Sequence, residues 1–416
     1  MSFKELPIMP DKKKSVLLFY PYVSKKTPNN VKNKLYGRWV GQGPMVDKFE
    51  NEFKKKFAKS SSAIATGSGT DSLHLAYILA GLKKGDEVIT TIFTCTATNI
   101  PMLYMGLKIK FADIERDTMN ISIDSVKKLI TKRTKAIVCV HYGGLPCDMD
   151  SLQKICKQKK ITLIEDAAHA LGAKYKKKPI GSISDFTTFS FQAIKHFTTG
   201  DGGMLTIKNK KLEEKAKRIR WFGIDRKKKQ KGIWKNDVYE VGYKYQMTDI
   251  SATMGCDALN DFSKIINHRK KIYNTYLQEL SPNKKIQCIH DYDKNKEHGA
   301  WLFIQFHPAC ILRRNDGIVH RLGKQPVSIR SWLCQPGLCC CGDDGVQTEP
   351  GFSSCGGDRA INFSLGGRWW ARLSNGDSPQ LCPRRCRGCL LDRCHLADRG
   401  FCIPVSTVQA GEFGLS

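Results

Sequence analysis

Short apolar runs alternate with helix-like stretches along the chain from about residue 17 to about residue 306. We expect strands at residues 87–93, 108–113, 135–141, 161–165 and 186–191. Apolar residues at helical spacing mark residues 123–130 and 149–159 as helices. This rhythm of strand, helix and strand predicts an α/β fold with a mostly parallel sheet whose faces are covered by helices.

The alternation of predicted strands and helices ends at about residue 248. Residues 249–280 are predicted to form one or two long helices, with Arg269, Lys270 and Lys271 on a solvated face. We therefore divide the chain into a large domain with an N-terminal arm, residues 1–250, and linking helices that begin a small domain, residues 251–306. The apolar run at 300–304 would be exposed if no complete small domain covered it.

A lysine follows the strand predicted at 186–191. Lys195 stands five residues after Ser190 and just before a glycine cluster at 200–203. In so lysine-rich a chain a single lysine is usually a solvated surface residue. The buried strand before Lys195 favours a functional role, because burial lowers the pKa of a lysine and frees its amine to act as a nucleophile. This pattern is typical of a Schiff-base lysine that binds an aldehyde cofactor.

Two further segments supply what such a cofactor needs. The strand at 161–165 runs into Asp166, and a buried aspartate can pair with the protonated ring nitrogen of pyridoxal phosphate and keep the ring an electron sink. A glycine turn at 67–69 opens into an apolar helix, whose first backbone N–H groups would bind a phosphate. Taken alone, that turn is equally consistent with an ordinary helix cap.

Together these residues resemble the DegT/DnrJ-type sugar aminotransferases, which are pyridoxal-phosphate enzymes of the aspartate aminotransferase fold, fold type I. These enzymes make amino sugars on nucleotide carriers. The resemblance extends from about residue 17 to about residue 306. The matching motifs stand in order at residues 41–44, 49–50, 68–71, 85–88, 141–150, 165–169, 189–195 and 242–247.

The resemblance implies a role for each matching position. Lys195 would be the catalytic residue that bonds the cofactor and moves protons, and Asp166 would pair with the pyridine nitrogen. The other cofactor-binding positions that the resemblance implies are Gly69, Thr70 and Ser190 at the phosphate, and His169 near the phenolic oxygen. It also implies a homodimer in which the loop carrying Lys244 and Tyr245 reaches the neighbour's site.

Three positions bear on how closely the chain follows the family. Cys95 stands where the family usually stacks an aromatic residue on the cofactor ring, so Phe93 or a looser pocket must compensate. Lys244 replaces an asparagine that bonds the phosphate, and would act by charge instead of geometry. Relatives that carry histidine at the position of Lys195 are dehydratases. Here the lysine is present and His196 only follows it, which favours amino transfer.

The expected activity is therefore transfer of an amino group, with glutamate as donor, to the keto group of a nucleotide-linked 6-deoxyhexose. Donor and sugar are implied by the resemblance alone. Two alternatives remain open from the sequence. One is a sugar dehydratase that uses the same cofactor, and the other is a non-catalytic remnant of the family.

Residues 307–416 have a different composition. They contain one lysine, 12 arginines and 11 of the 17 cysteines, whereas residues 1–306 contain 48 lysines and 7 arginines. A frameshift, a chimaeric assembly or readthrough would explain such a switch. The alternative is a metal or disulfide module, but the spacing of Cys382, Cys386, Cys389, Cys394 and His395 lacks paired CxxC knuckles, so we predict no metal site. We expect the small domain to be lost or replaced and the tail to be disordered. The activity of this chain would then depend on residues 1–306 alone.

Charge and hydropathy limit the remaining classes of partner. The formal net charge is +29, and residues 1–306 carry +25 of it. The lysines are scattered without the interleaved aromatic residues of a nucleic-acid groove, so we predict no nucleic-acid partner. No membrane-spanning run or signal-peptide pattern is found, and we expect a cytoplasmic protein. The six cysteines before residue 307 should then be thiols.

Overall fold

The computed structural model describes residues 21–306, except 227, 229–236, 285–286 and 291–292. All of these residues belong to one compact unit. The tail at 307–416 lies outside the described residues. The predictions of disorder, of a frameshift and of a missing metal site in that tail therefore stay predictions.

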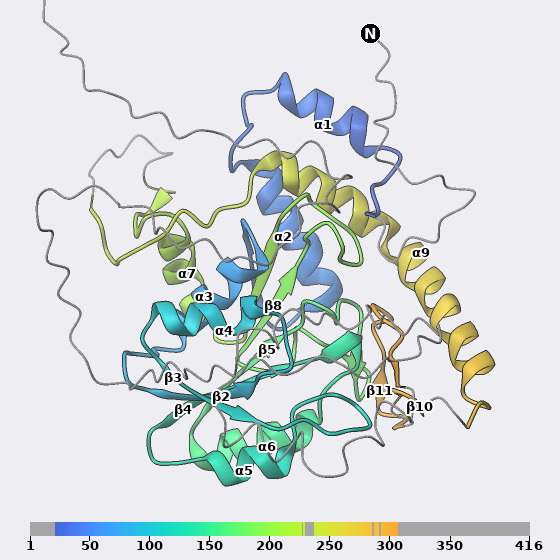
Figure 1. Cartoon of the computed structure of the whole chain (residues 1–416). Coiled ribbons are helices and arrows are strands. Elements are labelled where there is room, and N and C mark those ends of the chain that lie inside the picture. Colours follow the sequence, from blue (N-terminus) through green and yellow to red (C-terminus); the bar gives the residue numbers. More distant parts are fainter. Residues whose placement is uncertain (1–20, 227, 229–236, 285–286, 291–292, 307–416) are drawn as a thin grey trace, which may run out of the picture. The chain divides into compact units, whose positions relative to one another are not determined.

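A seven-stranded sheet forms the centre of the molecule, in the order β1-β9-β8-β5-β4-β2-β3 (Figure 1). Strands β8, β5, β4, β2 and β3 run parallel, and β9 is antiparallel to both β1 and β8. All five predicted strands are present, while β1 and β9 were not predicted. The bounds are β1 Ser62–Thr66, β2 Glu87–Thr91, β3 Lys108–Ala112, β4 Thr134–Val140, β5 Thr162–Asp166, β8 Phe186–Ser190 and β9 Gly203–Ile207.

Helices cover both faces of this sheet. The helices are α1 Thr27–Leu35, α2 Pro44–Phe57, α3 Gly69–Leu79, α4 Thr96–Tyr104, α5 Ile123–Leu129, α6 Met149–Lys159, α7 Glu213–Arg220 and α9 Asp249–Leu280, with short 3₁₀ turns at Tyr142–Gly144 and Lys210–Leu212. Successive residues of a strand point to opposite faces. In β4, Ile137 joins the core under α2, α5, α6 and α9, and Val138 joins the core under α3, α4 and α7. The predicted α/β fold with a mostly parallel, covered sheet is therefore confirmed.

Two small sheets accompany the central one. Three short strands form the first of them, in the order β11 (Lys296–Glu297), β6 (Lys174–Tyr175) and β7 (Lys178–Pro179). The other pairs β10 (Gln287–Cys288) with β12 (Gln305–Phe306). Residues 287–306 thus return to the large sheet's neighbourhood after α9, because β11 pairs with β6 through Lys296 and Tyr175.

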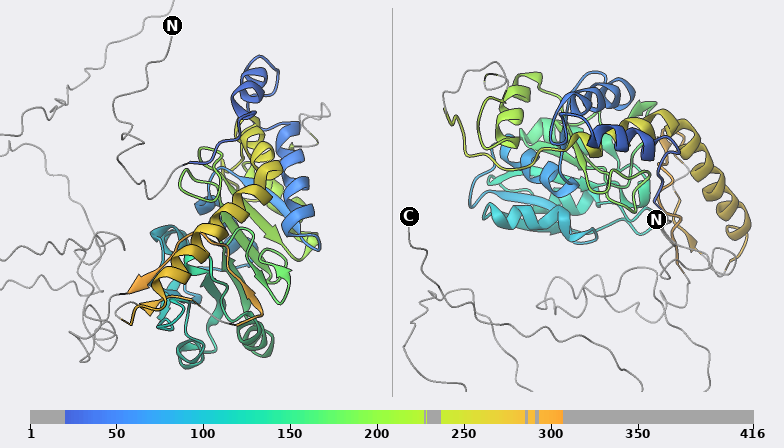
Figure 2. Two further views of the ribbon diagram at one scale, coloured as in Figure 1. Left: turned by 90° about the vertical axis from the view of Figure 1, so that its right-hand side faces the viewer. Right: turned by 90° about the horizontal axis from the view of Figure 1, so that it is seen from above.

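Helix α9 is one continuous helix of 32 residues that lies along α2 (Figure 2). Its apolar stripe packs into the core through Leu259 and Phe262, among others. Its first residue, Asp249, is fully buried and accepts hydrogen bonds from the backbone N–H groups of Gly43 at 2.7 Å and Val46 at 3.2 Å. Because those groups open α2, the Asp249 carboxylate caps a helix that has no side-chain cap of its own.

Two predictions about this region need correction. Arg269 does not lie fully on a solvated face, because the residue is half-buried and its guanidinium lies 3.5 Å from the carbonyl oxygen of Trp301. The apolar run at 300–304 is covered in part: Ala300 is 5% and Trp301 is 9% exposed, while residues 302–304 are half-buried. The run returns against loops of the large sheet, where the Leu302 N–H donates to the Gly143 carbonyl oxygen at 3.0 Å.

The six cysteines of the described residues, Cys95, Cys139, Cys147, Cys156, Cys256 and Cys288, are all free thiols, as the sequence predicts. Within the same residues, we find no helix whose length and apolar character would let it cross a bilayer.

A buried ion pair connects α2, β1 and α7. Glu50 accepts from the Arg220 guanidinium at 2.5 Å and from the Ala65 N–H at 2.9 Å, and both charged side chains are almost fully buried. Arg220 also donates to the Ala65 carbonyl oxygen at 2.7 Å. Removing one member of such a pair leaves the other charge buried without its counter-charge.

We predict that Glu50→Gln lowers the free energy of unfolding by about 3 kcal/mol, because Arg220 then keeps a buried charge without a carboxylate. Urea unfolding followed by circular dichroism measures this. Asp124→Asn is the matched control, since Asp124 pairs with Lys127 on an exposed surface and should leave the unfolding midpoint almost unchanged. Equal midpoints for Glu50→Gln and wild type would contradict the role of the pair.

Candidate active site

The carboxyl ends of three parallel strands meet at one edge of the sheet. β5 ends at Asp166, β8 ends at Ser190, and β4 is followed by His141. The register places Asp166 between Val140 of β4 and Thr188 of β8. Ligands of open α/β sheets bind outside this edge, so the loops that leave these strands form the candidate site.

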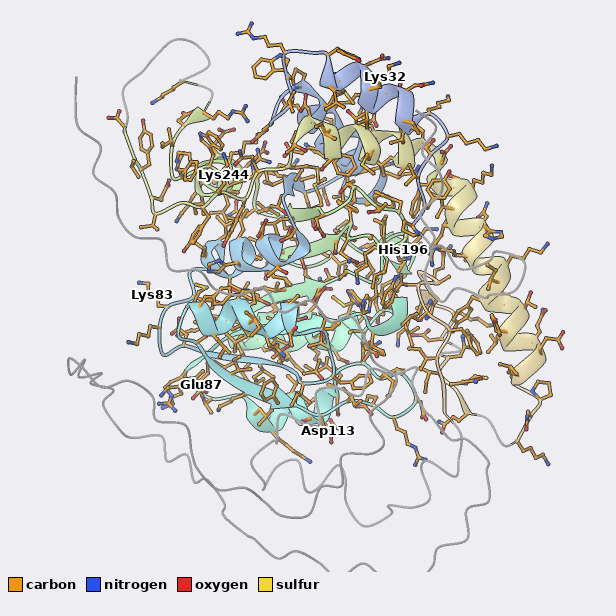
Figure 3. All side chains as sticks on the ribbon, turned by 45° about the horizontal axis from the view of Figure 1, so that its top comes forward. Lys32, Lys83, Glu87, Asp113, His196 and Lys244 are labelled. Atoms are coloured by element: carbon orange, nitrogen blue, oxygen red, sulfur yellow. The ribbon has the colours of Figure 1, made fainter. Side chains whose placement is uncertain are left out.

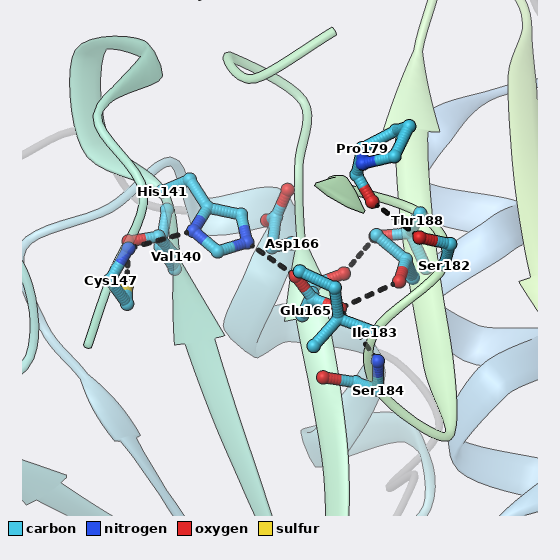
Figure 4. A network of polar contacts seen from close by, with 12 residues as sticks. Val140, His141, Cys147, Glu165, Asp166, Pro179, Ser182, Ile183, Ser184 and Thr188 are labelled. Carbon is cyan, nitrogen blue, oxygen red and sulfur yellow. Dashed lines mark hydrogen bonds and ion pairs between the residues drawn. The ribbon is translucent and has the colours of Figure 1, made fainter. Parts of the chain in front are cut away.

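Glu165 and Asp166 follow one another in β5 and point to opposite faces of the sheet. Glu165 is fully buried and accepts hydrogen bonds from His141 Nε2 at 2.8 Å, Thr187 Oγ1 at 2.9 Å and the Ser184 N–H at 3.1 Å (Figure 4). Burial raises the pKa of Glu165, but the hydrogen bonds from His141, Ser184 and Thr187 outweigh it and hold the pKa below its usual value. Glu165 is therefore a structural carboxylate that fastens β4 and β8 to β5.

Asp166 is 5% exposed and lies on the side of the sheet that α4 covers. Its Oδ2 accepts from Thr98 Oγ1 at 2.7 Å, and its Oδ1 accepts from the Ala168 N–H at 3.1 Å. Thr94 Oγ1 lies 2.7 Å from Thr98 Oγ1, so a chain of hydroxyls leads to the carboxylate. Each carboxylate oxygen keeps acceptor capacity for a further donor, such as a ring N–H.

The Lys195 amine lies close enough to this carboxylate for the Asp166 charge to act on it. Burial lowers the pKa of Lys195, and the nearby Asp166 and Cys95 only partly offset this by raising it. The amine lies 4.4 Å from the centre of the Trp301 ring. A lowered pKa makes the neutral form of a lysine easier to reach, and the neutral amine is the form that can act as a nucleophile or take up a proton.

His169 faces the same space from the loop after β5. Its imidazole stacks on the Trp301 ring, with ring centres 3.6 Å apart and planes at 13°, and meets Tyr142 edge-on at 6.0 Å. Burial, and then the charges of Lys195 and His196, hold the pKa of His169 well below its ordinary value, so the ring is neutral. Its Nδ1 is buried and has no hydrogen-bond partner among the described residues.

A turn at the start of α3 meets the end of β8. Ser68 caps the helix by accepting from the Asp71 N–H at 3.0 Å, and Gly69 and Thr70 open its first turn. A side chain at Gly69 would put its Cβ 2.8 Å from the Cβ of Ser190, so only glycine allows this approach. The Ser190 hydroxyl and the first N–H groups of α3 thus form one cradle of donors, which suits a phosphate.

The structure describes Cys95, which stands where the family usually has an aromatic residue. Cys95 is exposed and immediately precedes α4. It lies close enough to Lys195 to affect the pKa of the amine. Phe93 packs on Tyr142, with ring centres 4.5 Å apart, and Tyr142 in turn meets His169. These two rings supply an aromatic wall next to the position where Cys95 offers only a thiol.

Lys244 lies elsewhere in its own chain. Its amine sits 4.4 Å from the ring centre of Trp221 and 5.3 Å from that of Phe222. Figure 3 shows Lys244 well separated from His196, the neighbour of Lys195. The hydroxyl of Tyr245 contacts His74 Nδ1 at 2.9 Å. The predicted site residues are thus gathered around Lys195 and around Ser190, with Lys244 as the exception.

Sequence reasoning missed three residues of this site: Thr98, Tyr142 and Trp301. Thr98 had a signal, because it lies three residues after Cys95, in the first turn of the helix that follows β2. Tyr142 directly follows the predicted strand at 135–141. Trp301 had no signal, since an apolar run 106 positions after Lys195 is indistinguishable from ordinary core.

These residues fit pyridoxal phosphate. The cofactor needs a carboxylate for its ring nitrogen, a lysine for its aldehyde, donors for its phosphate and a neutral donor for its phenolic oxygen. Asp166, Lys195 and the cradle at Gly69 and Ser190 supply the first three. His169 Nδ1, buried without a partner among the described residues, is available as the fourth.

Comparison with known proteins identifies the family of the chain. The model of the DegT/DnrJ/EryC1/StrS aminotransferase family matches residues 21–336. The chain is 33% identical over 290 residues to the GDP-perosamine synthase of Escherichia coli O157:H7, covering 70% of this chain and 77% of that protein. It is 35% identical over 285 residues to the spore coat polysaccharide biosynthesis protein SpsC of Bacillus subtilis, covering 67% and 73%.

The fold comparison leads to the same family. A putative sugar aminotransferase of Streptococcus pneumoniae, Spr1654 in its PMP form, superposes with a TM-score of 0.67 at 28% identity, covering 70% of this chain and 79% of that chain. Structures of the same protein in its PLP form and its apo form match with a TM-score of 0.66. The chain therefore belongs to the DegT/DnrJ/EryC1/StrS aminotransferase family and is a pyridoxal-phosphate-dependent enzyme.

Proposed function

We propose that this protein transfers an amino group from glutamate to a keto group on a nucleotide-linked sugar, for the biosynthesis of an amino sugar in a polysaccharide. The observation that carries the proposal is the half-buried Lys195 at the carboxyl edge of the sheet, where the charge of the buried Asp166 carboxylate acts on its amine. Pyridoxal phosphate supplies the aldehyde that takes up the amino group and the ring that withdraws electrons. The cytoplasm, with its thiols kept reduced, is the proposed compartment.

Each residue has a proposed task in this reaction. Asp166 holds a proton on the ring nitrogen by charge, while Thr98 and the Ala168 N–H keep its carboxylate oriented. Lys195 would take a proton from the carbon that carries the amino group and return one to the carbon on the other side of the same nitrogen. Its lowered pKa makes the neutral amine available as a base. Gly69, Thr70 and Ser190 hold the phosphate, and His169 holds the phenolic oxygen.

Two further observations support a nucleotide-linked sugar as the acceptor. Relatives of this chain include GDP-perosamine synthases from Escherichia coli O157:H7 and Vibrio cholerae, whose names contain a nucleotide sugar. Residues 1–306 carry a net charge of +25, which would attract a substrate with a doubly charged diphosphate. Lysine at position 195 supports amino transfer over dehydration.

We also propose a homodimer with shared sites. The surface around the loop at 242–247 exposes large apolar side chains, which isolated soluble proteins rarely gather in one patch. In the described part of the chain they are Leu103, Tyr104, Phe222, Val238, Tyr239 and Val241, exposed by 58%, 68%, 43%, 64%, 47% and 81%. A second copy that covers this patch would bring Lys244 to the partner's cofactor.

We predict that Lys195→Ala lowers the turnover number at least about 10³-fold, because the residue that binds the cofactor covalently and moves the proton is lost. Borohydride reduction of the holoenzyme, followed by peptide mapping, should find the cofactor on Lys195 in the wild type. Lys208→Ala is the control, because Lys208 follows β9 at the opposite end of the sheet and should keep full activity. A cofactor mapped to any other lysine would rule out the assignment.

We predict that Asp166→Asn still binds the cofactor but lowers turnover about 10²-fold, because an amide cannot hold the charge on the ring nitrogen. The amide still fits between Thr98 and Ala168, so the melting temperature should change little. Absorbance titration gives the cofactor affinity, and amino-group transfer from glutamate gives the rate. Turnover equal to that of the wild type would argue against the proposed role.

We predict that mixing Lys195→Ala subunits with Lys244→Glu subunits restores about a quarter of wild-type activity, because half of the randomly paired dimers then contain one intact site. Each variant alone should be inactive. Subunit exchange is verified by mass spectrometry of differently tagged chains. If exchange is complete and no activity returns, Lys244 does not act in the partner's site.

A further inference from the structure

The segment Gly299–Leu302 is tied to two loops of the active site. The Gly299 N–H donates to the Gly144 carbonyl oxygen at 2.8 Å, and the Leu302 N–H donates to the Gly143 carbonyl oxygen at 3.0 Å. On the other side, His196 Nε2 donates to the Gly299 carbonyl oxygen at 2.7 Å. The segment therefore bridges the loop after β4 and the loop that carries Lys195.

Trp301 stands at the centre of that segment and makes three contacts with the site. Its indole N–H donates to the carbonyl oxygen of Ile194, next to the lysine, at 3.1 Å. Its ring lies 4.4 Å from the Lys195 amine and 3.6 Å from the stacked His169 ring. One side chain thus touches the backbone before the lysine, the lysine's amine and the imidazole on the opposite side of the site.

The backbone of Trp301 is also held in place. Arg269 of α9 lies 3.5 Å from its carbonyl oxygen, and the neighbouring Leu302 is bonded to Gly143. A ring fixed at both its N–H and its backbone has little freedom to turn. It can therefore act as a rigid platform for a lysine side chain, which is long and flexible.

The chemistry of the indole suits this task. The face of a tryptophan ring attracts an ammonium group, and stacking on a neutral imidazole restricts the tilt of that ring. Lys195 must release the cofactor and then carry a proton during part of each reaction cycle, and in that interval its amine needs another support. We propose that Trp301 is a positioning residue that holds the free Lys195 amine and the His169 ring in working geometry. This inference rests on the proposed role of Lys195.

A purely structural role for Trp301 makes a different prediction. If the indole only filled space, an aliphatic residue of similar burial would serve equally well. If its ring face holds the amine, phenylalanine should replace it and leucine should not. Phe303 provides the matched control, because it lies two residues further along the same segment and packs on Tyr273 and Tyr276 instead of on Lys195.

The experiment measures how fast the full-length apoprotein captures pyridoxal phosphate at Lys195, as a function of pH, for Trp301→Phe, Trp301→Leu and Phe303→Leu. Capture is followed by absorbance and by borohydride fixation with peptide mapping. It needs no amino donor and no sugar. The high-pH plateau of the rate reports the orientation of the neutral amine, and the midpoint of the pH dependence reports its pKa.

We expect Trp301→Leu to lower the plateau about 10-fold, because the amine is no longer held. The midpoint should fall by about half a pH unit, since the ring face that favours the ammonium is gone. Trp301→Phe should stay within about 3-fold of the wild type with an unchanged midpoint. Phe303→Leu should lower the melting temperature without changing either quantity. Trp301→Met replaces the leucine variant if that variant does not fold.

Equal plateaus and midpoints for Trp301→Leu and Trp301→Phe would overturn the inference. So would a Phe303→Leu variant that slows capture as much as Trp301→Leu does, because the segment would then matter only for stability. Failure of the proposed function looks different. In that case the wild-type protein itself would show no cofactor fixed to Lys195, whatever residue stands at 301.

Discussion

The buried Glu165 carboxylate is the contact on which the site depends. It accepts from His141, which follows β4, and from Ser184 and Thr187, which lead into and lie in β8. A buried carboxylate with several donors tolerates little displacement, because each lost hydrogen bond leaves a desolvated polar group. Glu165 thus holds the carboxyl end of β4 and the first residues of β8 in register with β5.

The register of these strands fixes where the side chains of the candidate site lie. Because side chains alternate along a strand, Asp166 faces the α4 side of the sheet whenever Glu165 faces the other. The loop after β8 then brings Lys195 to the same edge, and the loop after β4 offers Gly143 and Gly144 to the returning segment at 299–302. The active site is assembled from elements that are separated by more than a hundred residues.

The prediction from sequence was accurate where local pattern decides the structure. The five apolar runs became strands, and the helix expected at 149–159 spans those residues. β1 and β9 were missed. β9 begins in a glycine cluster, and it forms a strand because it pairs with β1 on one side and β8 on the other. Arg269 was placed on a solvated face, because the sequence does not reveal that its guanidinium reaches the carbonyl oxygen of Trp301, 32 positions further along the chain.

The sequence by itself predicted the fold class and, through the family resemblance, the cofactor, and it singled out Lys195 and Asp166 as candidate site residues. Those residues lie at strand ends, where a parallel sheet puts its reactive groups, and strand ends are visible as apolar runs. Only the tertiary structure decided which residues surround them. Thr98 meets Asp166 and Trp301 meets Lys195 through contacts 68 and 106 positions apart in the chain, which depend on packing of whole helices and loops and leave no local periodicity to read.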